Sequence, residues 1–147
     1  MERILGRYQK AEQLHRRALA IRETVLGPMH SDVAATLNNL AEVHREERNF
    51  AKAEDLYRRA LVIWETAHGP RDEHVASALT NLGQLFASLG RFQEAEEVLE
   101  RAVSIWTSGQ RRDEAGLLTA WNNLAFTYSN QKRYSLAEPL FRNALQL

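Results

Sequence analysis

The sequence of 147 residues contains no cysteine. This absence excludes a disulfide framework, a thiolate zinc site and a thiol nucleophile. The longest apolar runs are only a few residues, too short for a transmembrane helix, and the amino-terminal stretch MERILGRYQKAEQ lacks the apolar centre of a secretory signal. We therefore expect a cytoplasmic protein that makes no membrane contact.

The chain also lacks net charge, because 19 Lys and Arg residues balance 19 Asp and Glu residues. No global field would attract nucleic acid or an anionic membrane surface, and the basic residues are scattered without forming a stripe. We therefore expect no nucleic-acid partner. With 44% hydrophobic and 26% charged residues, the composition is that of a folded globular chain.

Signatures of catalysis and metal binding are missing as well. The five histidines include no pair with the spacing of metal ligands on one helical face. The chain has no glycine-rich phosphate loop, no GxSxG elbow and no HExxH helix. Several carboxylates recur at one fixed interval, which favours scaffold roles over a catalytic dyad. The sequence therefore predicts a protein that is not an enzyme, with no catalytic residue, no metal and no cofactor.

What the sequence does contain is a repeat of 42 residues. The positions that keep this interval are Tyr8, Phe50, Phe92 and Tyr134; Ala11, Ala53, Ala95 and Ala137; Glu12, Glu54, Glu96 and Glu138; and Leu40, Leu82 and Leu124. Repeats of this length are typical of solenoids built from stacked helical units.

Each repeat is predicted to hold two helices. The first, at about 31–47 in the first full repeat, places on one face Val33, Leu37, Leu40, Ala41 and His44. The second, from about 50 to 68, has an apolar stripe formed by Ala53, Leu56, Tyr57, Ala60, Leu61 and Ile63. Because only a few residues join the two helices, they must lie antiparallel.

The repeated positions resemble the tetratricopeptide repeat. Its first-helix pattern of a large residue, leucine, a small residue and an aromatic is matched by Leu79, Leu82, Gly83 and Phe86 and by Trp121, Leu124, Ala125 and Tyr128. Its second-helix pattern of alanine, aromatic and alanine is matched by Ala53, Tyr57 and Ala60 and by Ala137, Phe141 and Ala144. The unit is similar in particular to the kinesin light chain subclass, over almost all of residues 5–147. His44 departs from the pattern where an aromatic is usual, and Leu99 replaces the second-helix aromatic.

This resemblance implies an all-α fold, a right-handed α-solenoid of antiparallel helix pairs with about seven helices. We expect one solenoid over residues 1–147, with an unpaired second helix at 4–26 and repeats at about 31–68, 72–109 and 113–147. Glycine and proline in LGPMHSD and HGPRDEH separate the repeats. Because the chain stops at NALQL, before the continuation that its earlier repeats possess, we expect a fragment of a longer array.

Asparagines recur inside the predicted first helices, although asparagine is a poor residue for a helix interior. If Leu37 and Leu40 face the partner helix, then Asn39 points away from it by close to half a turn. The resemblance implies that this side is the concave groove of the solenoid. The predicted peptide-binding residues on this side are Asn38, Asn39, Glu42, Thr80, Asn81, Gln84, Asn122, Asn123 and Phe126.

The recurring amides have two interpretations. An amide is both donor and acceptor, which suits the backbone of an extended peptide, and the resemblance implies that asparagines at this position have that role in peptide-binding relatives. In the alternative, the amides bond to a neighbouring helix and fix the repeat spacing. Phe126 is either an anchor for a ligand or is buried against the next helix. Trp64 and Trp106 are expected to cover the ends of the second helices, with a second contact surface as the alternative.

These features predict a protein-interaction module that holds a peptide or a partner helix in its concave groove. The alternative is a structural spacer or a self-association arm with no groove ligand, forming a homo-oligomer through solenoid ends that include Leu145, Leu147 and the first helix. A regulatory segment of a larger multidomain protein is a third interpretation. The sequence does not identify the partner.

Overall fold

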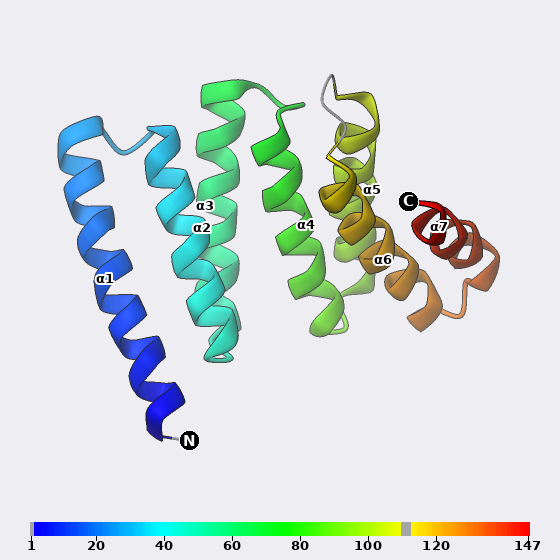
Figure 1. Cartoon of the computed structure of the whole chain (residues 1–147), viewed down its shortest axis with the longest axis horizontal. Coiled ribbons are helices and arrows are strands. Elements are labelled where there is room, and N and C mark those ends of the chain that lie inside the picture. Colours follow the sequence, from blue (N-terminus) through cyan, green and yellow to red (C-terminus); the bar gives the residue numbers. More distant parts are fainter. Residues whose placement is uncertain (1, 110–112) are drawn as a thin grey trace. The chain divides into compact units, whose positions relative to one another are not determined.

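A computed structural model describes residues 2–109 and 113–147 of the chain, which form seven helices and no strand (Figure 1). The helices are α1 (Glu2–Leu26), α2 (Ser31–Glu46), α3 (Phe50–His68), α4 (Glu73–Ser88), α5 (Phe92–Ser108), α6 (Glu114–Asn130) and α7 (Tyr134–Gln146). The predicted all-α fold of paired helices is confirmed.

The helices belong to two compact units, unit 1 (Met1–Pro70) with α1 to α3 and unit 2 (Arg71–Leu147) with α4 to α7. In unit 1, α2 packs against both α1 and α3. In unit 2, α4 pairs with α5 and α6 pairs with α7, while α6 also contacts α4 and α5. In each unit, therefore, a first helix packs against the second helix that precedes it and the second helix that follows it.

Local signals in the sequence account for the helix ends. Before α4 and α6, the side chains of Asp72 and Asp113 accept hydrogen bonds from backbone N–H groups of the first turn, at 2.9 and 3.0 Å. These caps satisfy donors that have no partner within the helix. After α1 and α3, Gly27 and Gly69 adopt φ angles of 91° and 92°, which stop a helix without the steric penalty that a side chain would incur.

The core lies between the helices of each pair. All five residues predicted for the inner face of α2 are buried. In α3, the predicted stripe is buried at its alanines, at Tyr57 and at Ile63, whereas Leu56 and Leu61 are only half-buried. The α4–α5 pair is especially close, because a Cβ atom added to Gly83 would lie 2.3 Å from Leu99 Cγ. The lack of a side chain at Gly83 is therefore required by the packing of α4 on α5.

Each helix pair turns through one residue with a left-handed backbone. Arg48, Gly90 and Lys132 occupy the same position in successive repeats and have φ angles of 62°, 75° and 60°. A side chain in this conformation costs about 1–2 kcal/mol, whereas glycine adopts it freely. The chain therefore carries backbone strain at two of the three turns.

We expect Lys132→Gly to raise the free energy of unfolding by about 0.5–1 kcal/mol, because the relief of strain exceeds the entropy that glycine loses on folding. The matched change Gly90→Ala should lower it by about 1 kcal/mol. Urea unfolding of both variants measures the two effects. Equal destabilisation by both substitutions would show that the turn is not strained at Lys132.

Candidate functional site

In unit 2, a surface pocket of about 240 Å³ lies between α4 and the start of α6. Its lining consists of Ser77, Thr80 and Asn81 from α4, Trp106 from α5, and Ala115, Gly116 and Thr119 from α6. None of these side chains is charged. The pocket can therefore accept a small side chain without pairing a charge.

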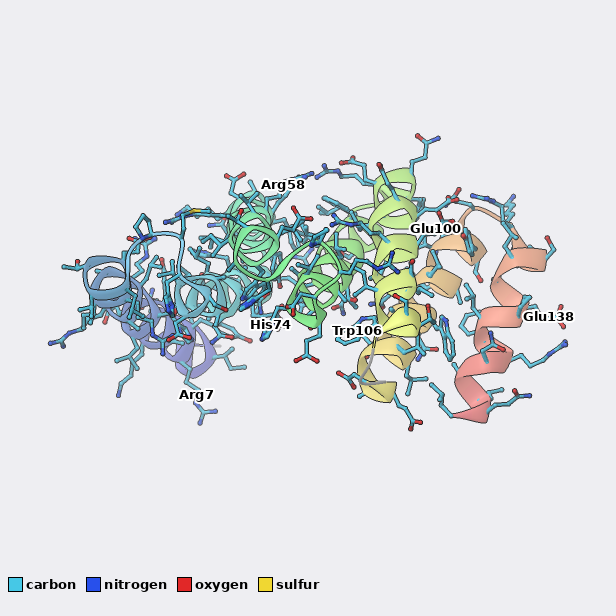
Figure 2. The ribbon with its side chains drawn as sticks, turned by 90° about the horizontal axis from the view of Figure 1, so that it is seen from above. Arg7, Arg58, His74, Glu100, Trp106 and Glu138 are labelled. Carbon is cyan, nitrogen blue, oxygen red and sulfur yellow. The ribbon has the colours of Figure 1, made fainter. Side chains whose placement is uncertain are left out.

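Trp106 forms one wall of this pocket, at the end of α5 (Figure 2). Only 4% of the residue is exposed, and a Cβ atom added to Gly116 would lie 2.7 Å from its ring. The indole therefore packs against the start of α6, and the absence of a side chain at Gly116 makes room for it. Trp64 is buried to the same extent in unit 1.

Thr80 was predicted to contact a ligand, but its side chain is not exposed. The residue is buried, and its hydroxyl donates to the Ala76 carbonyl at 2.8 Å. The same hydroxyl accepts a long hydrogen bond of 3.5 Å from Trp106 Nε1. Its polar group is therefore already used to position the indole, and Thr80 contributes to the pocket as a supporting residue.

The two predicted asparagines of unit 2 lie on α4 and α6, which contact each other. Asn81 is half-buried and lines the pocket. Asn123 is also half-buried, and its Nδ2 atom is fully buried without a hydrogen bond to any described residue. A buried donor without an acceptor costs about 1–3 kcal/mol, so such a group calls for a partner.

Phe126 follows Asn123 by three positions on α6 and is 52% exposed. No described helix buries it, and its role as an anchor for a ligand stays a prediction. The corresponding positions of the other first helices carry Gln84, which is exposed, and Glu42, which is half-buried. Asn122 is exposed one position before Asn123.

In unit 1, Asn39 is exposed and Asn38 is half-buried on α2. Glu42 has a structural role that the sequence did not predict, because its carboxylate accepts hydrogen bonds from the Tyr57 hydroxyl and, at 2.6 Å, from Arg45. This contact ties α2 to α3. Because Asn39 belongs to unit 1 and the other two asparagines of its series belong to unit 2, a continuous ladder of three amides stays a prediction.

Two hydroxyl side chains that line the pocket were not among the predicted contacts, and neither were Ala115 and Gly116. Ser77 and Thr119 line the pocket one helical turn before Asn81 and Asn123. Both could have been found from the helical period, since residues four positions apart lie on the same face of a helix. Their short side chains gave no chemical reason to single them out.

Two buried tyrosines have perturbed acidity. Burial raises the pKa of Tyr57 above its ordinary value of 10.0, and the hydrogen bond to Glu42 raises it further. Burial likewise raises the pKa of Tyr128, whose hydroxyl donates to Glu100 at 2.6 Å. In both cases a carboxylate stabilises the neutral phenol and disfavours the phenolate.

Neither a metal cluster nor a membrane-spanning helix is found among the residues that the structure describes. No group of three or more histidine, aspartate or glutamate residues could hold a metal ion there. Within the same ranges, no helix combines the length and the apolar character needed to cross a membrane.

Comparison with known proteins identifies the type of repeat. Two family profiles, both described as tetratricopeptide repeat, match the chain, one at residues 1–61 and 32–108 and the other at residues 117–147. No curated protein matches the chain in sequence. Among solved structures, BtubC (BKLC) from P. vanneervenii is 31% identical with a TM-score of 0.88, over 96% of this chain and 56% of that chain. The present chain thus spans little more than half of that relative.

Two other structures share the fold at lower identity. Kinesin light chain-type repeats from P. anserina are 22% identical with a TM-score of 0.82, over 96% of this chain and 67% of that chain. The N-terminal domain of stress-induced protein-1 from C. elegans is 21% identical with a TM-score of 0.65, over 79% of this chain and 84% of that domain.

Alkaline pH is expected to destabilise the chain through Tyr57 and Tyr128. Their pKa values are raised in the folded state, so the stability that they contribute is complete below the unfolded value of 10.0 and is lost as the pH rises above it. In the double variant Tyr57→Phe, Tyr128→Phe, the free energy of unfolding should fall less between about pH 9 and pH 11. Urea unfolding against pH measures this difference, with the exposed Tyr134→Phe as the control. Parallel curves for parent and double variant would contradict it.

Proposed function

Since the chain belongs to the tetratricopeptide repeat family, of the kinesin-light-chain-like type, we propose that it is a protein-interaction module that holds a peptide or a partner helix along α4 and α6. Proteins with these repeats generally mediate protein–protein interaction, and the fold is typically a non-enzymatic scaffold. A cytoplasmic location is part of the proposal. The face involved is the concave groove expected from the sequence.

The observation that carries the proposal is the Asn123 amide. Its Nδ2 atom lacks an acceptor among the described residues, and because the residue is only half-buried, a turn of the amide toward the groove would let it donate to a backbone carbonyl of a bound peptide. Such a bond would remove the penalty of the unpaired donor, so its strength would be available to binding. Because the bond is made to the peptide backbone, it tolerates many ligand sequences.

The neighbouring features define the ligand further. Thr119, at the pocket, and Phe126 are separated by seven positions of α6, which corresponds to about 10 Å along the helix. An extended peptide covers that distance with about three residues. One small side chain of the ligand would enter the pocket, and an apolar side chain about three residues away would contact the exposed ring of Phe126.

The charge of this face limits the ligand as well. The acidic, basic and histidine residues of α4 and α6 are Glu73, His74 and Glu114, all within the first two residues of their helices. Between Ser77 and Phe126 the two helices present amides, hydroxyls and apolar groups. We therefore expect a ligand segment that is uncharged where it crosses α4 and α6.

Selection from a random peptide library displayed on phage tests the proposal. Peptides enriched on the parent chain should lose at least about tenfold in affinity with Asn123→Ala and with Phe126→Ala, measured by fluorescence polarisation. Asn143→Ala on α7 is the control, because this exposed asparagine lies on another helix. Thermal melting separates a ligand contact from a scaffold role. Removal of an unpaired donor should leave the melting temperature of Asn123→Ala unchanged or higher, whereas a large decrease with retained binding would contradict the proposal.

A second candidate function is self-association through α7. Phe141 and Leu145 are 42% and 89% exposed on this helix, and Leu136 is 43% exposed. Exposed apolar side chains grouped on one helix are typical of protein contact surfaces.

Light scattering over a wide concentration range tests this second function. A self-association arm would show a molar mass that rises with concentration, and Leu145→Gln would return it to that of the monomer. The control Val62→Gln changes an exposed apolar residue of α3, which is 54% exposed and lies on neither end helix. A parent chain that stays monomeric throughout would exclude the arm and leave the groove as the interaction site.

A further inference from the structure

Unit 1 has a surface pocket of its own, where α1, α2 and α3 meet. It has a volume of about 300 Å³, and its apolar lining is formed by Leu19, Leu40 and Leu56, one from each helix. Arg16, Lys52 and Asp55 add charged groups to its lining. We refer to it as the α1–α3 pocket. It is separate from the groove residues of unit 2.

The α1–α3 pocket lies beside a position where this repeat departs from the others. His44 lines the pocket and is only 2% exposed, and the same position in the next repeats is occupied by Phe86 and Tyr128. Imidazole is shorter than either six-membered ring. The replacement therefore leaves space that a larger aromatic side chain occupies in the later repeats.

Unit 2 shows what fills the corresponding space. The Tyr128 hydroxyl donates to Glu100 Oε1 at 2.6 Å. Glu100, which Figure 2 labels, occupies the repeat position of Arg16. Leu124 and Leu140 occupy the repeat positions of Leu40 and Leu56. A phenol is thus the group that this arrangement of helices accepts in the third repeat.

The first repeat also lacks the cover that the other repeats place over the aromatic ring. The guanidinium of Arg91 lies 4.4 Å from the centre of the Phe86 ring, and that of Arg133 lies 4.9 Å from the centre of the Tyr128 ring. The corresponding residue in the first repeat is Asn49. Both the ring and its covering cation are therefore absent from this repeat.

The imidazole of His44, which lines the α1–α3 pocket, lies beside two carboxylates. The Nε2 atom of His44 lies 3.7 Å from Glu12, and Nδ1 lies 3.5 Å from Glu47. The Nδ1 atom is buried and makes no hydrogen bond to any residue that the structure describes. Glu12 is paired with Arg16 at 2.7 Å, so the lining of the pocket combines leucine side chains with groups that can bond a single hydroxyl.

We propose that the α1–α3 pocket binds a phenol ring, supplied either by a tyrosine side chain of a partner polypeptide or by a free phenolic molecule. The ring packs against Leu19, Leu40 and Leu56. Its hydroxyl oxygen accepts from the guanidinium of Arg16, which occupies the repeat position of Glu100, the acceptor of the Tyr128 hydroxyl in unit 2. The ligand thus takes the place that the repeat's own aromatic side chain has in Tyr128.

An NMR titration of the ¹⁵N-labelled chain with 4-methylphenol tests this site. Shift changes should be confined to residues around the α1–α3 pocket, with a dissociation constant on the order of millimolar for so small a ligand. Toluene has the same ring without the hydroxyl and should bind at least about threefold more weakly. N-Acetyltyrosinamide distinguishes the two sources, since binding as tight as that of 4-methylphenol indicates a tyrosine side chain and weaker binding indicates a free phenol.

The variant His44→Tyr provides the decisive comparison, because it places the repeat's own phenol in the pocket. It should raise the melting temperature and weaken 4-methylphenol binding at least about tenfold. Leu19→Ala, which removes part of the apolar wall, should also weaken binding and does not depend on the folding of the tyrosine variant. Phe126→Ala should leave the titration unchanged, which separates this site from the groove of unit 2. Undiminished binding to both His44→Tyr and Leu19→Ala, or shifts spread over the whole chain, would overturn the proposal.

Discussion

The close approach of the two helices in each pair is the constraint on which the other features depend. At Gly83 the backbone of α4 lies so near Leu99 that no side chain fits between them. This contact sets the rotation of the first helix about its own axis. Once that rotation is set, Ser77 and Asn81 lie along the pocket of unit 2. Tight packing on one face of α4 thus determines which of its residues a ligand can contact on the opposite face.

Most of the fold could be predicted because the same pattern of apolar and small residues occurs in three repeats. Leucines, alanines and small residues at helix contacts recur at the interval of 42 residues, so a departure in one repeat does not obscure the signal from the others. The half-burial of Leu56 and Leu61 was not predictable from periodicity. Burial at the edge of a stripe depends on how far the neighbouring helix extends over it, and spacing along one helix carries no information about that.

The site was less predictable, because hydrogen bonds between helices decide which polar groups remain available. Thr80 bonds Trp106, 26 positions later, and Glu42 bonds Tyr57, 15 positions later. Both residues lie at positions consistent with a groove contact, but their polar atoms are already used within the protein. The buried nitrogen of Asn123 is the opposite case. Its helical position was evident, whereas the lack of a partner depends on side-chain geometry.

The division into two units has a consequence for how stability should be understood. A chain whose helices contact mainly their neighbours loses structure in segments, and its parts need not unfold in one step. A ligand on α4 and α6 would raise the free energy of unfolding of unit 2 by mass action. The free energy of unfolding of unit 1 would rise only as far as the two units are coupled. Partly folded forms, in which one unit is intact and the other is open to proteases, are then a normal part of the native ensemble.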